Sequence, residues 1–275
     1  MLDNIFAIIQ YNMHNSGSTQ SSFLRELDPH QHHVIAVQEP NVMGQRKTRT
    51  DPRYHLVFPT SLPARTCIYV SKEIPTSKWK VDEKSGFFTT LTLDLGERTV
   101  HIHNCYNQPN STSSRNLGTL IHLEQALQRE GEHVLLGDFN LHHPRWGGGA
   151  VLTQHNTADC LISQTEEAGM SPLLEPGTAT RKDRNGTSTL DLIFATTWIE
   201  NRVRECRVAS ELENGSDHEP IITTIDMHTP ITTPAPSRPQ WKRAAWGEVG
   251  AILDLSLIHI SEPTNRTRSR MPSSA

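Results

Sequence analysis

Short runs of apolar or β-branched residues, each about the length of a β-strand, recur along the first 227 residues of this chain. Polar turns separate the runs, and helical patterns are fewer than strand patterns. The chain order mixes strand–strand and strand–helix steps. This predicts an α/β fold, a four-layer α/β sandwich of two packed mixed β-sheets flanked by helices. The runs lie at Ile5–Gln10, Val34–Val37, Thr66–Val70, Val100–Asn104, Val134–Leu136, Leu190–Ala195 and Ile221–Ile225.

Helical spacing of apolar residues occurs in three segments, which we predict to be helices over Ser18–Leu27, Asn116–Arg129 and Thr157–Glu167. Asn116 is of a type that caps helix N-termini well. The segment Phe87–Leu95 alternates a mostly apolar face with a more polar one. We therefore predict a half-buried strand there.

The composition changes abruptly after Asp226. Residues 228–240 hold four prolines and several threonines, which is typical of an extended linker. Residues 241–275 form a basic tail that begins with an amphipathic pattern too short to fold alone. The stretch Ser256–Ala275 has no coherent pattern and looks in part like a translated sequencing adapter, so we expect the end to be artefactual. We predict one domain over residues 1–227.

Charge is divided unevenly between this domain and the tail. The domain holds 20 Lys and Arg against 27 Asp and Glu, whereas residues 228–275 hold 6 against 3. Proteins that grip nucleic acid nonspecifically do so mostly with Lys and Arg, so an acidic domain is not typical of them. Any phosphate chemistry in this domain would need a metal cation to reverse the local charge.

No segment approaches the roughly 18–20 uninterrupted apolar residues that span a bilayer, and the first residues lack the pattern of a signal peptide. We therefore expect an intracellular, water-soluble protein with no membrane partner. The four cysteines lie tens of residues apart and form no CxxC pair, which disfavours a zinc ribbon or a redox motif. We expect all four to be core residues rather than disulfide partners: Cys67, Cys105, Cys160 and Cys206.

Carboxylate, amide and imidazole side chains follow or end several predicted strands. Enzymes of the α/β class place reactive groups there, on loops held by a rigid scaffold. Glu39 and Asp217 offer the hard oxygens that Mg²⁺ prefers. His218 has an unperturbed pKa near neutrality, and Asp191 is suited to orient it, as a buried carboxylate orients the imidazole of hydrolytic triads. The full set is Asn12, Glu39, Tyr106, Asn107, Asp138, Asn140, Asp191, Asp217 and His218.

Each of these residues also has an ordinary structural interpretation. A lone Asp after a strand is most often a turn former or a helix cap, and a His beside an Asp is more often a surface hydrogen bond than a base. Asp138 and Asn140 are two residues apart, so on an extended chain they face the same way. The order of the whole set is stronger evidence than any single member.

That order resembles the endonuclease/exonuclease/phosphatase superfamily, and most closely the apurinic-type endonuclease domain of LINE-type non-LTR retrotransposons. The resemblance covers about residues 4–227. The later segment WKRAAW is similar to the basic stretch that, in such elements, leads toward a reverse transcriptase, which this chain lacks. The matching motifs are YN at Tyr11–Asn12, QEP at Gln38–Pro40, YNQP at Tyr106–Pro109, GDFN at Gly137–Asn140, LDLIF at Leu190–Phe194 and SDHEPI at Ser216–Ile221.

The resemblance implies a divalent metal, Mg²⁺ with Mn²⁺ as a substitute. Glu39, helped by Asn12 and Asp217, would hold it, and the metal would offset negative charge on the phosphate as the bond breaks. Asn12 would also contact the substrate. One departure from the pattern is Glu219, which adds negative charge beside Asp217 where many relatives carry an apolar or small residue.

The remaining roles implied by the resemblance are catalytic. Asp138 would position or deprotonate the attacking water, and Asn140 would donate hydrogen bonds to the scissile phosphate. His218, oriented by Asp191, would contact the phosphate or transfer a proton. Tyr106 would contact the phosphate or assist the leaving group. The reaction would be direct attack of water on a phosphodiester, with electrostatic stabilisation as the main contribution.

Two groups of basic residues have two interpretations each. Thr180 stands where the superfamily places a residue near the substrate, and the loop after it either contacts the DNA backbone through Arg181 or is a solvated hairpin tip with Lys182 and Arg184. The residues Arg46, Lys47, Arg49 and Arg53 either line a DNA path or keep a loop soluble. Five histidines lack further ligands at compact spacing, so we expect them at the surface: His30, His32, His33, His142 and His143.

We expect a Mg²⁺-dependent DNA endonuclease that nicks target DNA for retrotransposition, acting in the nucleus beside a reverse transcriptase domain. A second hypothesis keeps this catalytic core but changes the substrate to RNA or to a lipid or inositol phosphate, because the acidic domain does not require DNA. A third hypothesis is an inactive retroelement fragment that only binds. The sequence argues against the third, because drift would be expected to damage some of the ordered motif residues.

Overall fold

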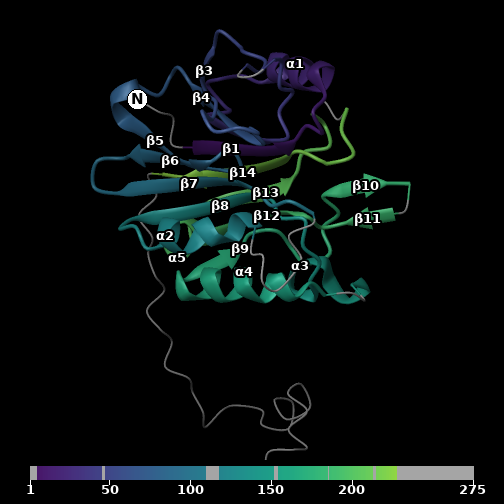
Figure 1. Ribbon diagram of the computed structural model, residues 1–275. Helices are drawn as coiled ribbons and strands as arrows, with labels where there is room; N and C mark the ends of the chain where they lie inside the picture. Colours follow the sequence, from purple (N-terminus) through teal and green to yellow (C-terminus); the bar gives the residue numbers. More distant parts are fainter. Residues whose placement is uncertain are drawn as a thin grey trace, which may run out of the picture. The chain divides into compact units, whose positions relative to one another are not determined.

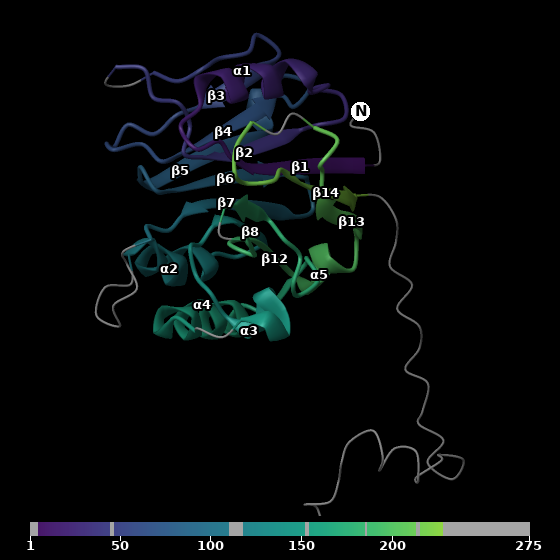
Figure 2. The ribbon, with the colours of Figure 1, turned by 90° about the vertical axis from the view of Figure 1, so that its right-hand side faces the viewer.

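Two six-stranded mixed sheets pack against each other, with helices on the outer face of each (Figures 1 and 2). The computed structural model describes residues 5–44, 47–109, 118–151, 154–184, 186–212 and 215–227. The predicted linker and tail, residues 228–240 and 241–275, lie outside this range. Within it, no helix is long and apolar enough to cross a membrane. The predicted sandwich of two mixed sheets flanked by helices is confirmed.

The first sheet contains one parallel pair, β1–β2, among antiparallel neighbours. Its strands, in spatial order, are β13 (Val203–Val208), β14 (Ile221–Asp226), β1 (Ile5–Asn12), β2 (Val34–Gln38), β4 (Thr66–Ser71) and β3 (Tyr54–Val57).

The second sheet likewise contains one parallel pair, β7–β8. Its strands, in spatial order, are β5 (Trp79–Ser85), β6 (Phe88–Asp94), β7 (Thr99–Tyr106), β8 (Glu132–Asp138), β12 (Asp191–Thr196) and β9 (Met170–Pro172). A small hairpin of β10 (Arg181–Asp183) and β11 (Gly186–Ser188) projects from the body (Figure 1).

Helix α1 (Gly17–Glu26) covers the first sheet, and α2 (Leu123–Leu127) and α4 (Asn156–Glu167) cover the second (Figure 2). Ser16 caps α1, because its hydroxyl accepts the backbone N–H of Thr19 at 3.3 Å. Two of the three predicted helices are thus found within a residue of their expected bounds. The remaining short elements are α3 (Pro144–Gly147), α5 (Thr197–Glu200) and the 3₁₀ helices η1 (Thr76–Lys78), η2 (Gly118–His122) and η3 (Gly148–Ala150).

The prediction of one continuous helix over Asn116–Arg129 is wrong. The described part of this segment is the 3₁₀ helix η2 followed by the short helix α2, and Asn116 itself lies outside the described residues. Leu120 and Leu123 are both buried, but a spacing of three residues suits a 3₁₀ turn as well as an α-helix.

Three hydrophobic clusters hold the layers together. Side chains of β1 alternate, so that Phe6 and Ile8 face the second sheet while Ile9 and Tyr11 face α1. The third cluster lies between the second sheet and its helices. Strands in the middle of such a sandwich are buried on both faces.

The prediction that the Phe87–Leu95 strand is half-buried is therefore wrong. In β6, every residue from Phe88 to Leu93 is buried. The polar face stays inside because its threonines have partners; for example, the Thr90 hydroxyl lies 2.9 Å from Nδ1 of His103.

The cysteines and one histidine refine the sequence expectations further. Cys67 and Cys105 are buried as predicted, but Cys160 and Cys206 are only half-buried; all four are free thiols. His33 was expected at the surface, yet it is 3% exposed. Its Nδ1 accepts the backbone N–H of Ala7 at 3.1 Å, which satisfies the ring inside the protein.

Candidate active site

The carboxyl ends of both parallel strand pairs carry the candidate residues. Asn12 ends β1, and Glu39 directly follows β2, its parallel neighbour. Tyr106 ends β7 and is paired in register with Asp138 at the end of β8. On the other side of Asp138, the ladder continues with Asp191, the first residue of the antiparallel strand β12. Each sheet thus contributes polar residues at its strand ends.

Backbone strain is concentrated at the same strand ends. Four non-glycine residues among those described have positive φ: His14 (45°), Asn15 (55°), Glu39 (45°) and Asn140 (50°). This conformation is uncommon for side-chain-bearing residues and persists where surrounding contacts fix it. Here Glu39 donates its N–H to the Arg65 carbonyl at 2.9 Å, and its own carbonyl accepts the Asn15 N–H at 2.8 Å.

Gly137 allows the close approach of β8 to β7 that sets Asp138 beside Tyr106. It has a φ of 148°, and a Cβ built on it would lie 1.8 Å from the Cys105 carbonyl oxygen. Any other residue would push the two strands apart. The glycine of the GDFN motif therefore serves strand packing.

The Asp138 carboxylate is fixed by two amides. Asn12 Nδ2 donates to its Oδ2 at 2.9 Å, and Asn140 Nδ2 donates to the same oxygen at 3.0 Å. The Asn140 backbone N–H donates to Oδ1 at 3.0 Å. Asp138 and Asn140 do meet, but through a left-handed turn at Asn140 rather than along an extended chain as the sequence predicted.

His218 lies between two buried carboxylates. Its Nδ1 lies 2.7 Å from Oδ2 of Asp191, and its Nε2 lies 3.9 Å from Oδ2 of Asp138. Asp191 is held in turn, because Gln10 Nε2 donates to its Oδ1 at 3.2 Å and its backbone N–H donates to the Thr180 hydroxyl at 3.0 Å.

The buried neighbours of Asp138 and His218 shift the pKa values of both side chains. Burial and the neighbouring Asp191 raise the pKa of Asp138 to about 7. Burial opposes a charge on His218, but Asp191 and then Asp138 outweigh it and raise its pKa to about 9. His218 therefore holds a proton on each ring nitrogen at neutral pH. Burial, then Glu39, raises the pKa of Tyr106, so the phenol stays protonated.

Two arginines face the carboxylates that were predicted to bind metal. Arg65 Nη1 donates to Oε1 of Glu39 at 3.4 Å, and Arg181 Nε donates to Oδ2 of Asp217 at 2.9 Å. His14 Nδ1 lies 3.0 Å from Oδ1 of Asp217. Burial opposes ionisation of Asp217, but Arg181 and the two histidines near it outweigh burial and lower its pKa.

The hairpin is anchored on the loop that carries His218. Lys182 donates its backbone N–H to the Asp217 carbonyl at 2.7 Å, and its Nζ donates to Oε1 of Glu219 at 2.7 Å. Glu219 is 4% exposed, so its charge is matched inside the protein by this lysine.

Two residues that the sequence placed near a substrate or a DNA path have structural contacts inside the protein. Thr180 is fully buried, and its hydroxyl accepts the N–H groups of Leu190 and Asp191, each at 3.0 Å, so this hydroxyl positions Asp191 and is not exposed to a substrate. The guanidinium of Arg53 binds Asp51 and the carbonyls of Leu24 and Leu27, so it stabilises the C-terminal end of α1. Arg46 lies outside the described residues.

The donor set fits a divalent cation. One ligand atom from each of Asp138, Asp191 and His218 lies within 4.8 Å of the others, so this buried group could hold a metal ion. A protonated His218 engaged with Asp191 is a poor ligand, however. The carboxylates of Glu39 and Asp217 offer hard oxygens, and each is matched by an arginine that a cation would replace.

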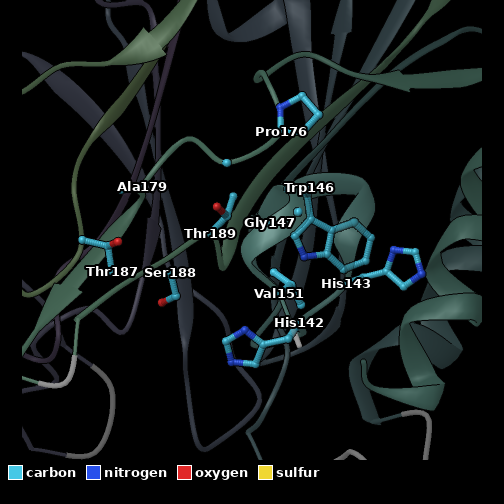
Figure 3. A pocket seen from close by; sticks show the side chains of 13 residues that line it. His142, His143, Trp146, Gly147, Val151, Pro176, Ala179, Thr187, Ser188 and Thr189 are labelled. Atoms are coloured by element: carbon cyan, nitrogen blue, oxygen red, sulfur yellow. The ribbon is translucent and has the colours of Figure 1, made fainter. Parts of the chain in front are cut away.

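A hollow of about 700 Å³ opens between the loop that follows β8 and the residues at β11 (Figure 3). His142 and His143 lie on one wall with Trp146, and Thr187 and Thr189 lie on the other. Both histidines are half-buried, and the side chain of His143 is only 12% exposed, so they are less exposed than a surface position implies.

Sequence reasoning missed Arg65, His14 and Gln10. Arg65 directly precedes β4, which is antiparallel to β2, so it lies where β2 ends. That placement follows from strand pairing, which single-sequence patterns do not give. His14 and Gln10 flank Asn12 at alternate positions, a signal that was present in the sequence.

Comparisons with known proteins agree with this geometry. Residues 100–222 match a family model described as endonuclease-reverse transcriptase, a range that contains Asp138, Asp191 and His218. No curated protein matches the chain.

Solved structures share the fold over most of the chain. The endonuclease domain of TRAS1, a telomere-specific non-LTR retrotransposon, is 16% identical, with a TM-score of 0.64 over 82% of this chain and 100% of that one. The AP endonuclease LMAP from Leishmania major is 12% identical, with a TM-score of 0.61 over 81% and 88%. An AP endonuclease from Archaeoglobus fulgidus is 20% identical, with a TM-score of 0.60 over 80% and 99%. The body of this chain is thus a domain of the endonuclease/exonuclease/phosphatase fold, and its residues 100–222 match the endonuclease-reverse transcriptase family.

Proposed function

We propose that this domain is a metal-dependent phosphodiester hydrolase that nicks DNA. The observation that carries the proposal is the buried Asp138 carboxylate, which two amides hold 3.9 Å from the Nε2 atom of His218 at the strand ends of both sheets. A carboxylate and an imidazolium in this relation suit attack of water on a phosphate.

Glu39 and Asp217, with the Asn12 amide oxygen, would hold Mg²⁺ or Mn²⁺. Such a cation, when bound, offsets the negative charge on the phosphate. It also accounts for catalysis by an acidic domain, because the local charge at the phosphate becomes positive.

Asp138 would accept the proton of the attacking water. Its raised pKa makes it a stronger base than a solvated carboxylate, and Asn12 and Asn140 fix its direction. His218 would donate its Nε2 proton toward a phosphate oxygen, while Asp191 fixes the ring through Nδ1. The protonated phenol of Tyr106 would donate toward the phosphate or the leaving oxygen.

DNA is the proposed substrate because the similar structures include a retrotransposon endonuclease domain and AP endonucleases. The hairpin presents Arg181 and Lys182 beside the site, where they suit contacts to a DNA backbone. We further propose that the nick serves retrotransposition in the nucleus, with a reverse transcriptase domain as partner.

The test is nicking of supercoiled plasmid by the purified chain with Mg²⁺, with EDTA, and with the variants Asp138→Asn and His218→Ala. We expect relaxed circles with Mg²⁺, none with EDTA, and at least about 100-fold slower nicking by either variant. Poly(A) and a lipid phosphodiester serve as competing substrates. Nicking that survives EDTA or both substitutions would overturn the mechanism, and faster hydrolysis of a competing substrate would overturn the choice of DNA.

A further inference from the structure

We propose that Arg65 is a phosphate-binding residue of this site. The Glu39 carboxylate holds the Arg65 guanidinium until a divalent cation replaces the guanidinium on that carboxylate. The inference rests on the proposed function and adds a residue that neither the motifs nor the comparisons assign. Arg65 has a fixed backbone, a loose side-chain contact and a position at the strand-end edge.

The Arg65 backbone is fixed by both sheets. Its N–H donates to the Gly86 carbonyl at 2.6 Å, just before β6, and its carbonyl accepts the Glu39 N–H at 2.9 Å, just after β2. A Cβ on Gly86 would lie 2.2 Å from the Pro63 carbonyl oxygen, so the close approach needs glycine there. The base of the side chain is therefore held at the strand-end edge.

The Arg65 side chain is held only loosely. Its contact with Glu39 is 3.4 Å, longer than the roughly 2.7–2.9 Å of strong charge-assisted hydrogen bonds. The Arg65 side chain is 41% exposed, whereas that of Glu39 is 17% exposed. A guanidinium has five N–H donors in a planar fork, and this contact uses one of them.

Arg65 and a divalent cation compete for the same carboxylate. A cation on Glu39 would replace the attraction that holds the guanidinium, and a phosphate bound beside the cation would offer the fork new acceptors. Arg65 lies beside Glu39 at the strand-end edge, because its carbonyl accepts the Glu39 N–H at 2.9 Å directly after β2. The freed side chain therefore remains within the site.

Arg98 provides a matched control. Its Nη1 donates to Oε1 of Glu132 at 2.7 Å, and its side chain is 49% exposed. Glu132 is the first residue of β8, at the opposite end from Asp138. Arg98 also stacks over Trp198, with 4.8 Å from its guanidinium carbon to the ring centroid. Arg98 and Glu132 thus form a pair whose side-chain exposure is similar to that of Arg65 and Glu39. The pair lies at the end of β8 away from the candidate active site.

The first measurement is Mn²⁺ binding to the full chain by electron paramagnetic resonance. Arg65→Ala is expected to bind Mn²⁺ about twofold to fivefold more tightly than wild type, because it removes a competitor of surface ion-pair strength. Arg98→Ala is expected to bind it like wild type.

The second measurement is duplex binding with Mn²⁺ in an Asp138→Asn background, in which the duplex is expected to stay intact. Arg65→Ala is expected to lower the slope of log affinity against log salt by about one, the effect of one lost phosphate contact. Arg65→Lys keeps the charge and should keep the slope. In the active background, Arg65→Ala is expected to nick at least about tenfold more slowly at saturating Mn²⁺.

Unchanged Mn²⁺ affinity and an unchanged salt slope in a folded Arg65→Ala protein would overturn this proposal while wild type still nicks. An effect of Arg98→Ala equal to that of Arg65→Ala would also overturn it. A wild type that neither binds Mn²⁺ nor nicks would overturn the proposed function, and this proposal with it. Circular dichroism checks that each variant is folded.

Discussion

Buried histidines in two parts of the molecule have different partners: His218 lies on the loop before β14 of the first sheet, and three others lie on strands of the second sheet. His218 lies beside the carboxyl end of β8 and the amino end of β12, between Asp138 and Asp191. The other cluster, defined here as the histidine stack, lies further back on β7 and β8 and consists of His101, His103 and His133, each at most 5% exposed.

The hydrogen bonds of the histidine stack suit neutral rings. His133 Nε2 lies 2.9 Å from the Arg129 carbonyl and must donate to it, so its Nδ1 accepts from His103 Nε2 at 3.0 Å. His103 Nδ1 then accepts from the Thr90 hydroxyl at 2.9 Å. By the same logic, His101 donates to the Glu130 carbonyl at 3.0 Å. Every ring is satisfied without a charge.

Neighbouring carboxylates account for the difference in pKa between His218 and the histidine stack. Burial, then the other two rings, lowers the pKa of His103 well below its ordinary value, whereas the carboxylates raise that of His218 to about 9. The described non-glycine residues with positive φ lie near His218 and not on the strands of the histidine stack. The histidine proposed to be catalytic is thus the one that carboxylates and strained backbone accompany.

The largest expected effect is on catalysis. Asp138→Asn should lower plasmid nicking by about 10³-fold, because an amide cannot accept the proton of water. The free energy of unfolding should change by less than about 1 kcal/mol, since a neutral amide replaces a carboxylate buried beside Asp191. Nicking rates and urea unfolding measure the two quantities. A rate within tenfold of wild type would remove Asp138 from the mechanism.

The opposite pattern is expected for the histidine stack. His103→Ala should lower the free energy of unfolding by about 2–4 kcal/mol, because it leaves a cavity and an unpaired His133 Nδ1. Nicking at 20 °C should stay within about threefold of wild type. Urea unfolding checks the first value, with Ile121→Ala, which truncates a side chain at a 63% exposed residue, as the control. Equal losses in both variants would contradict the account.

Acid should destabilise the protein through the histidine stack. The pKa values of His103 and His133 are lowered in the folded state, so below about pH 6.5 the unfolded chain binds protons that the folded chain does not. This stability is present above pH 6.5 and is lost as pH falls, by up to about 1.4 kcal/mol per pH unit for each histidine. Glu132 opposes the shift of His133, and Arg129 contributes to it through its charge.

Urea unfolding between pH 7.5 and 5.5 measures this slope for wild type and His103→Gln. Other titrating groups are common to both proteins, so the difference belongs to the histidine stack. The slope of the variant should be shallower. Identical slopes would mean that His103 binds the same number of protons in the folded and the unfolded chain, so that folding does not lower its pKa.

The smallest expected effect comes from Thr180, whose hydroxyl supports Asp191 of the candidate active site. Thr180→Val removes the acceptor of two buried N–H groups and should cost about 1–2 kcal/mol. Nicking should fall about threefold to tenfold, because Asp191 loses part of its support. Thr180→Ser should restore both values, and failure of this rescue would show that the hydroxyl is not what matters.

The sequence predicts the sandwich and most strand-end residues because both depend on local patterns. Apolar runs predict strands, and Asp138 and Asp191 end or begin such runs. The errors arise where contacts with a neighbouring strand decide whether a side chain is buried. Thr180 lies in a charged segment, yet it is buried, and its hydroxyl accepts the backbone N–H groups of Leu190 and Asp191 at the start of β12. The alternating face of β6 looks exposed until His103 and His101 on the neighbouring strand supply partners for Thr90 and Thr92.

The most direct test of the account is the nicking rate of His218→Ala compared with His103→Gln, in Mg²⁺ and at a temperature where both are folded. The account predicts a loss of at least about 100-fold for His218→Ala and a rate within about threefold of wild type for His103→Gln. Similar rates for the two variants would show that the paired carboxylates do not distinguish the reactive histidine from the structural ones.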